Sequence, residues 1–138
     1  MNVQLRQFIG QHDWGWVKQR VDIHRVEDTC GIMAVDLDTN TTVAACILDS
    51  WTPNSVQGHM MIDNSLVLKH QFLQCCANYI YDVRGVKYVM GVVPDTNKKA
   101  IKMNKHMGYT VIAEVPDVIE DGCGVVIMQL TKENCTFL

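Results

Sequence analysis

The stretch from Val86 to Tyr109, VKYVMGVVPDTNKKAIKMNKHMGY, says most about how this chain folds. Its first part, Val86–Val93, is rich in β-branched and aromatic residues, a composition that predicts a buried strand. Pro94–Asn97 then breaks the strand and offers several residues that can cap a helix N-terminus. Apolar residues recur at helical spacing up to Met107, and Gly108 can end the helix because glycine adopts the left-handed conformation at little cost.

The segments on either side extend this succession of strand, turn and helix. Asp13 can cap a helix whose apolar stripe is Trp14, Val17 and Val21. A longer helix is predicted over Val67–Arg84, where apolar residues recur at every third or fourth position. The predicted strands cover residues 3–8, 30–37, 42–48, 56–63, 86–93, 110–115 and 125–130, with loops over 51–55 and 116–124.

This order of elements predicts an α/β (α+β) sheet covered by helices on both faces. A chain of 138 residues, 48% of them hydrophobic, suits one globular domain, which we expect over residues 1–132 with a loose tail at 133–138. The formal net charge of −3 argues against broad attraction to nucleic acid. Apolar runs fall short of the ~20 residues that span a bilayer, and the first residues lack the form of a signal peptide. We therefore expect a cytoplasmic protein that binds neither membrane nor nucleic acid.

The six cysteines raise the question of disulfides or a metal site. Cys46, Cys75 and Cys76 lie inside apolar segments, so we expect buried, reduced and unreactive thiols. The sequence has no Cys-x-x-Cys, and its five histidines are scattered, so metal-ligand spacing is absent and no metal site is predicted.

Several features of the first stretch occur together at a recognisable spacing. They are a strand-ending Val93, a helix-opening Asn97, Ala100 three residues later, Met103, and the closing pair Gly108–Tyr109. This pattern resembles the GNAT superfamily of N-acetyltransferases. The element order also resembles the GNAT fold, a mixed, mostly antiparallel sheet with two splayed parallel central strands, which we expect to be 56–63 and 86–93.

The resemblance implies that acetyl-coenzyme A lies in the notch between these two strands. Its pantetheine arm would pair with backbone groups of the first strand, and its pyrophosphate would rest on N–H groups at the start of the long helix, between Leu66 and Gln71. The implied cofactor-binding residues are Met61, Ile62 and Asp63 on the strand, Leu68, Lys69, His70 and Gln71 at the turn, and Asn97, Ala100 and Met103 on the last helix.

The sequence departs from the family at two positions. The phosphate turn, Asn64–His70, contains no glycine; Lys69 and His70 could compensate by contacting phosphate directly, or Lys69 could be a solvated surface residue. The position of the family's proton-donating tyrosine is Asn104, whose amide can hydrogen-bond a sulfur but cannot act as a general acid. The glycine-free turn also resembles, more narrowly, small phage-encoded GNAT-like proteins, which would act in the host cytoplasm.

His59 is the candidate general base, because an unperturbed histidine can accept a proton from an amine near neutral pH. The alternative is a half-exposed structural histidine. Lys98, Lys102 and Lys105 share one helical face, which is either a solvated surface or a contact for the 3′-phosphate of coenzyme A.

Two functions are compatible with these features. The first is an acetyl-coenzyme A-dependent N-acetyltransferase in which an amine, on a small molecule or a protein, attacks the thioester directly. The second is a GNAT-fold binding or structural protein that has lost catalysis. A homodimer is compatible with either function.

Overall fold

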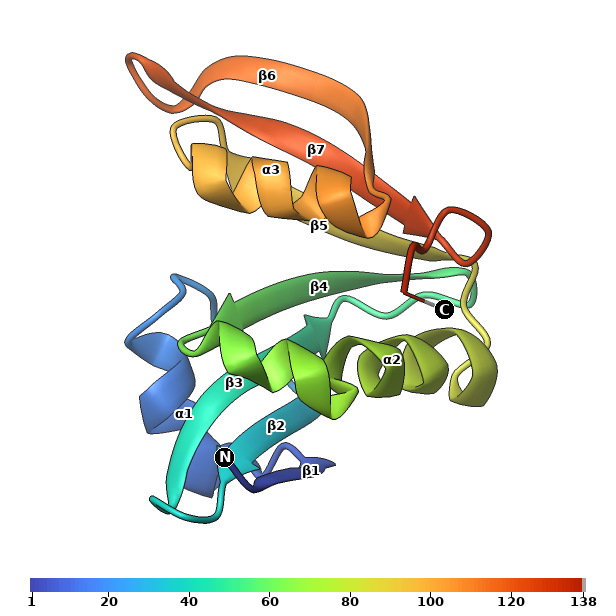
Figure 1. Cartoon of the computed structure of the whole chain (residues 1–138). Coiled ribbons are helices and arrows are strands. Elements are labelled where there is room, and N and C mark those ends of the chain that lie inside the picture. The colour runs from blue at the N-terminus through green and yellow to red at the C-terminus, as the bar shows by residue number, and fades with distance from the viewer. Residues whose placement is uncertain (138) are drawn as a thin grey trace.

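The computed structural model describes residues 1–137 and is built around one mixed sheet (Figure 1). The seven strands are β1 (Val3–Gln7), β2 (Cys30–Asp36), β3 (Thr41–Asp49), β4 (Ser55–Ile62), β5 (Tyr88–Pro94), β6 (Thr110–Glu120) and β7 (Cys123–Thr131). They lie in the order β1-β2-β3-β4-β5-β7-β6, and β4 and β5 form the parallel pair among antiparallel neighbours. The predicted mixed sheet with a central parallel pair is therefore confirmed.

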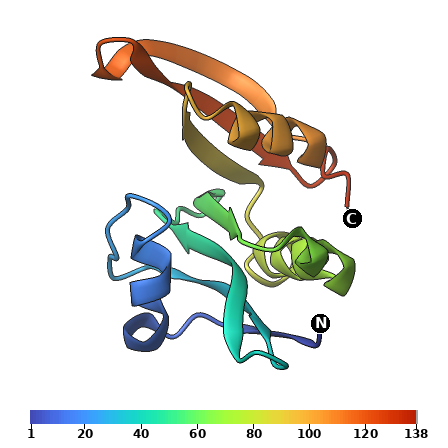
Figure 2. The same cartoon turned by 60° about the vertical axis from the view of Figure 1, so that its left-hand side comes forward.

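Helices cover both faces of the sheet. One face carries α1 (Gly10–Lys18), and the other carries α2 (Phe72–Ala77) and α3 (Lys98–Met107), as Figures 1 and 2 show. The prediction of one helix over Val67–Arg84 is wrong in detail. A 3₁₀ turn, η1 (Ser65–His70), comes first, Gln71 then adopts the left-handed conformation with φ of 62°, and α2 continues into a π-helical segment, η2 (Asn78–Val83).

Alternation along β3 divides the core between the two faces. Cys46 and Leu48 point towards α2, where the fully buried Phe72 fills the centre of the larger cluster. Ile47 lies on the opposite face and packs with Val17 of α1. We refer below to the α1 face and the α2/α3 face of the sheet.

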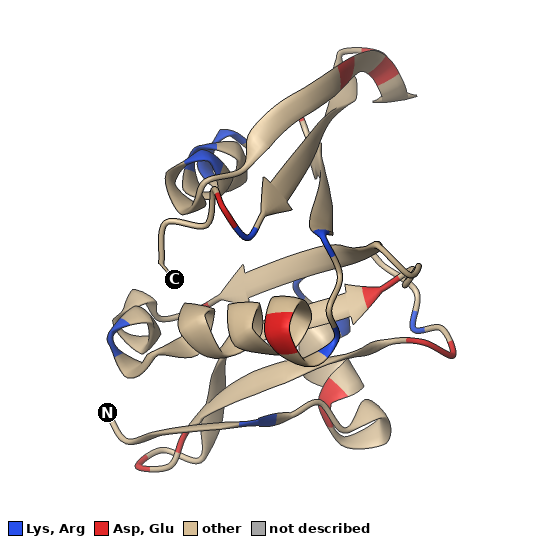
Figure 3. Cartoon of the chain, turned by 90° about the vertical axis from the view of Figure 1, so that its right-hand side faces the viewer, with Lys and Arg blue, Asp and Glu red and all other residues tan. Residues whose placement is uncertain are grey.

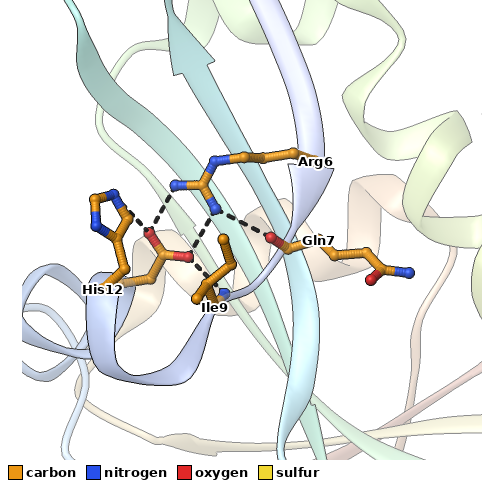
Figure 4. A network of polar contacts seen from close by, with 5 residues as sticks. Arg6, Gln7, Ile9 and His12 are labelled. Carbon is orange, nitrogen blue, oxygen red and sulfur yellow. Dashed lines mark hydrogen bonds and ion pairs between the residues drawn. The ribbon is translucent and has the colours of Figure 1, made fainter.

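An ion pair fixes the start of α1, and Figure 4 shows this network. Arg6 of β1 donates to both carboxylate oxygens of Asp13, at 2.7 and 2.8 Å, and the Ile9 N–H donates to the same carboxylate at 2.7 Å. The prediction that Asp13 is the N-cap is wrong, because the helix begins at Gly10 and Asp13 lies inside it, 3% exposed. Burial acts to raise the pKa of Asp13, but Arg6 and the Ile9 N–H outweigh it, so the pKa lies below its usual range.

The last two strands form a long hairpin where a loop over 116–124 was predicted. β6 continues to Glu120, and the tight turn is confined to Asp121 and Gly122, which has φ of 81°. The polar residues and Pro116 that suggested a loop are accommodated by an interrupted register between Val115 and Glu120, at the solvent-exposed edge of the sheet. β6 is exposed along almost its whole length.

The C-terminal segment packs against the core rather than forming the predicted loose tail. Cys135 is 7% exposed, and Thr136 donates its N–H to the Met107 carbonyl at 3.1 Å and its hydroxyl to the His106 carbonyl at 3.0 Å. Leu138 lies outside the described residues.

The cysteines are free thiols, and Cys46 and Cys76 are buried as predicted. Cys75 is only half-buried, which corrects the expectation of full burial, although burial still raises its pKa. Within residues 1–137, no helix is long and apolar enough to cross a lipid bilayer.

Candidate functional site

The central parallel strands separate soon after they meet. β4 and β5 pair only at Ser55–Tyr88, Val56–Val89 and Gln57–Met90, whereas β5 pairs with β7 along its whole length. Beyond Gln57 the two strands diverge, as Figures 1 and 2 show. A cavity of about 320 Å³ occupies this opening. The predicted splayed pair is confirmed, and its opening holds a cavity that can take a ligand.

Backbone groups of β4 point into the opening. The Asp63 N–H donates to the Val43 carbonyl at 2.8 Å, so Asp63 faces β3. Because backbone groups alternate along a strand, Met61 faces β3 as well, and Met60 and Ile62 present their N–H and C=O groups to the side where β5 has diverged. Of the three strand residues predicted from sequence, Ile62 therefore faces the opening, whereas Met61 and Asp63 face β3. Met60 also faces the opening, and the sequence argument missed it because it had no strand register.

The cavity reaches both faces of the sheet. On the α1 face His59 and Val92 line it, and on the other face Cys76 and Tyr81 line it. Of the residues predicted from sequence, the structure brings six together around this cavity: His59, Ile62, Asn97, Ala100, Met103 and Asn104. The other predicted residues, Met61, Asp63, Leu68, Lys69, His70 and Gln71, do not line it.

The start of α3 combines a structural role with a place on the cavity wall. The Asn97 side chain caps the helix by accepting the Ala100 N–H at 3.2 Å, and Asn97 and Ala100 both line the cavity. At the other end of this helix, Gly108 adopts the left-handed conformation with φ of 110°, as predicted. A side chain there would clash with the Asn134 carbonyl.

Asn104 and Tyr109 converge over Gly91 of β5. A Cβ atom at Gly91 would lie 3.8 Å from the Tyr109 ring and 3.9 Å from the Asn104 amide nitrogen, so glycine leaves room for both. Asn104 donates weakly to the Met128 sulfur at 3.7 Å. Tyr109 lines the cavity, and among residues 1–137 its hydroxyl makes no hydrogen bond, whereas the Tyr81 hydroxyl donates to the Leu130 carbonyl at 2.7 Å. Burial raises the pKa of Tyr109 far above its usual range, so the phenol keeps its proton.

The turn between β4 and α2 is shaped without glycine. Asn64 caps the 3₁₀ segment, accepting the Leu66 N–H at its side chain (3.0 Å) and the Val67 N–H at its carbonyl (3.1 Å). Those two N–H groups are therefore unavailable to a phosphate, which corrects the expectation that donors begin at Leu66. Gln71 adopts the left-handed conformation that glycine would take at lower cost, and the first turn of α2 starts there. Lys69 is exposed beside this turn.

His59 has a buried carboxylate beside it. Its Nε2 atom lies 3.2 Å from an Asp49 carboxylate oxygen, and Asp49 is 6% exposed at the end of β3. Asp49 was missed by the sequence argument. The available signal was an acidic residue ending an otherwise continuous apolar run from Val43 to Leu48.

Asp63 is committed to a different partner. Its carboxylate accepts two hydrogen bonds from Arg20, at 2.7 and 2.9 Å, and the Arg20 guanidinium stacks 3.7 Å from the centre of the Trp16 ring. The hydrogen bonds from Arg20 lower the pKa of Asp63. This pair closes the end of β4 against the segment that follows α1.

Several basic residues follow one another along α3, where the ribbon is blue in Figure 3. Lys98, Lys102 and Lys105 are all exposed, and Lys99, which was not predicted, borders the cavity. The three predicted lysines do not line the cavity.

Solved structures share this architecture. The spermidine/spermine N-acetyltransferase SpeG from Vibrio cholerae, in complex with manganese ions, superposes with a TM-score of 0.74 at 10% identity, covering 94% of this chain and 92% of that one. An N152L mutant of the same enzyme gives a TM-score of 0.77 at 10% identity and covers 99% and 96% of the two chains. A complex of the enzyme with CoA and spermine gives 0.74 at 9% identity, covering 96% and 97%. No protein-family model and no curated protein sequence matches the chain. The chain therefore has the fold of GNAT N-acetyltransferases.

Proposed function

We propose that this protein is an N-acetyltransferase that moves the acetyl group of acetyl-coenzyme A to an amine. The observation that carries the proposal is the opening between β4 and β5. Unpaired backbone groups of one strand, a histidine beside a carboxylate and a capped helix start all meet at one cavity there. The structures with the same fold include an N-acetyltransferase complexed with CoA and spermine, which supports the same chemistry here.

The residues present fit the arm of coenzyme A. The backbone of Met60 and Ile62 would pair with the amides of the arm, because these groups lack a strand partner. Ala100 and Met103 would pack along it, and Asn97 would hold the helix start beside it. Acetyl-coenzyme A would supply the activated acetyl group as a thioester.

The phosphates would bind at the start of α2 rather than across the whole turn. The N–H groups of Phe72 and Leu73 follow Gln71 in the first turn of a helix that continues through η2. Lys69 and His70 stand immediately before this turn and can add charge-assisted contacts. This arrangement replaces the close backbone approach that glycine would provide.

Side chains on both walls of the cavity would assist the transfer. His59 would accept a proton from the attacking amine on the α1 face. On the opposite wall the Tyr109 hydroxyl, which burial keeps protonated, would donate a hydrogen bond to the departing sulfur, with the Asn104 amide as a second hydrogen-bond donor, and the sulfur would take its proton from solvent. Tyr109 would thus replace in space the tyrosine that the sequence lacks at position 104.

Calorimetry with acetyl-coenzyme A tests binding. Lys69→Ala removes one charge-assisted contact, so affinity should fall roughly tenfold to a hundredfold. Lys87→Ala, an exposed lysine immediately before the paired start of β5, should leave affinity unchanged. Asn97→Ala should lower both affinity and stability, the latter by about 1 kcal/mol through loss of the helix cap.

Release of free thiol from acetyl-coenzyme A in the presence of spermidine, spermine, simple diamines or a lysine peptide then tests transfer of the acetyl group.

The glycine-free turn supports an alternative, a GNAT-fold binding protein without catalysis, such as a phage component or a host-interacting factor. This alternative predicts that no amine releases thiol from acetyl-coenzyme A. Absence of both a heat of binding and a thermal shift at millimolar acetyl-coenzyme A would overturn the enzyme proposal and favour the alternative.

A further inference from the structure

Asp49 is a buried carboxylate without a permanent cation. Within residues 1–137 the buried charged residues are Asp13 and Asp49. Asp13 has the Arg6 guanidinium, whereas no lysine or arginine of the described chain lies within 4 Å of Asp49. Burying an unpaired carboxylate costs several kcal/mol of folding free energy. A buried carboxylate is therefore found where hydrogen bonds from neighbouring groups offset that cost.

The compensation comes from His59 and Ser50. His59 Nε2 lies 3.2 Å from Asp49 Oδ2, and the Ser50 hydroxyl donates to Asp49 Oδ1 at 3.2 Å. In the register between β3 and β4, Ile47 pairs directly with His59, and Asp49 pairs directly with Gln57. Asp49 and His59 therefore lie diagonally opposite each other on the α1 face. His59 is 12% exposed at its side chain and lines the cavity.

We propose that Asp49 is a positioning residue that holds the proton of neutral His59 on Nε2 and thereby leaves Nδ1 as the proton acceptor. A carboxylate can only accept a hydrogen bond from a neutral ring, so the nitrogen that faces Asp49 must carry the proton. Among residues 1–137, no group hydrogen-bonds to Nδ1. The catalytic part of this inference rests on the proposed acetyltransferase function.

The proton balance of the step follows from this tautomer. The amine nitrogen forms a bond to the acetyl carbon and loses one proton to His59 Nδ1, while the carbon–sulfur bond breaks and the sulfur takes one proton from solvent. His59 is then a cation beside the Asp49 carboxylate and returns its extra proton to solvent. Asp49 neither gives nor takes a proton in this step.

Other charged groups on the α1 face do not compete for this role. Arg6 and Asp13 form one closed pair, and Arg20 and Asp63 form another. Asp49 is therefore the charged group that faces His59 in the described chain.

The first test needs no substrate. Long-range ¹H–¹⁵N correlation spectra of the whole protein, recorded where His59 is neutral, report which ring nitrogen carries the proton. We expect the Nε2–H form in the wild type, and a shift of population to Nδ1–H in Asp49→Asn, whose amide can donate to Nε2. The control Asp36→Asn, at the end of β2, should leave the spectrum of His59 unchanged. A wild-type ring protonated on Nδ1, or a tautomer unaffected by Asp49→Asn, would overturn the proposal.

The second test uses thiol release with the best amine acceptor. Asp49→Asn should lower kcat roughly tenfold to a hundredfold and leave KM for acetyl-coenzyme A unchanged, because general-base catalysis contributes on the order of 10²- to 10⁴-fold. In a His59→Ala background the same change should have no further effect. An equal loss in both backgrounds would overturn the link between the two residues. Asp49→Ser repeats both tests if the asparagine variant does not fold.

The two tests separate the two proposals. A wild-type protein that acetylates no amine overturns the proposed function and the catalytic role of Asp49 with it. The tautomer measurement still tests, in that case, whether Asp49 determines which ring nitrogen of His59 carries the proton.

Discussion

The two faces of the sheet are built from different interactions around the same opening. The α2/α3 face is held by apolar packing around Phe72, and its buried polar groups include the thiols of Cys46 and Cys76 and the hydroxyl of Tyr81. The α1 face combines apolar packing around Val17 with two buried carboxylates, Asp13 and Asp49. Under the proposed function, the α2/α3 face would pack along the arm of the cofactor, whereas the α1 face would hold the acceptor amine beside His59.

The two buried carboxylates of the α1 face differ in the residue that each one contacts and in whether that residue lines the cavity. Asp13 is paired with a permanent cation and lies away from the cavity. Asp49 is paired with a titratable ring that lines the cavity. A buried carboxylate beside arginine stabilises one geometry, whereas one beside histidine can support proton transfer.

The largest effect should come from the apolar face. Phe72→Ala removes a fully buried ring and leaves a cavity, so the free energy of unfolding should fall by about 3–5 kcal/mol. Urea denaturation measures this loss, which should be similar at pH 7 and pH 4 because no charge is involved. Ile119→Ala, 53% exposed on β6, is the control and should change stability by less than about 0.5 kcal/mol.

A smaller and pH-dependent effect should come from the α1 face. Asp13→Asn should cost about 2–4 kcal/mol at pH 7, because Arg6 loses its partner. The pKa of Asp13 is lowered by folding, so its contribution is present above the usual value of 3.8 and is lost as the pH falls through the lower folded value. Denaturation between pH 7 and pH 2 should therefore show a steeper loss of stability in the wild type than in the variant. Parallel curves would show that Asp13 contributes no charge-dependent stability. Asp22→Asn, at an exposed aspartate, is the control.

The exposed ion pair at the end of β4 should contribute less. Arg20→Ala should lower stability by about 0.5–1.5 kcal/mol, combining a part-exposed pair with Asp63 and the stacking on Trp16. The ion-pair part of this loss should shrink in 1 M salt. A loss above 3 kcal/mol that salt does not change would show that the pair is a structural anchor like Arg6 and Asp13.

The smallest effect concerns the turn that joins β4 to α2. Gln71→Gly relieves a left-handed backbone, so stability should rise by up to about 1 kcal/mol. Gln71→Ala keeps the strain and serves as the control. A clear destabilisation of the glycine variant in thermal unfolding would show that the Gln71 side chain has a structural role that its exposure does not reveal.

Local sequence patterns determined much of this fold. The strands, the helix from Asn97 and its stop at Gly108 follow from β-branched runs, a capping side chain and a glycine, all of which act within a few residues. Four of the predicted residues that line the cavity, Asn97, Ala100, Met103 and Asn104, lie in the stretch from Val86 to Tyr109. The interrupted helix before Arg84 could not be predicted, because its apolar periodicity is the same in a regular helix and in one with a left-handed break at Gln71.

Tertiary structure alone decided which groups face the opening and which residues become partners. Met60 and Ile62 point into it, rather than Met61 and Asp63, because a one-residue change of phase reverses every backbone group of a strand and that phase is set by pairing with β3. Asp49 and His59 are ten residues apart in sequence, and Gly91, Asn104 and Tyr109 come from β5, α3 and the connection between α3 and β6. Such contacts depend on register and packing between elements, and a single sequence carries no direct signal for them.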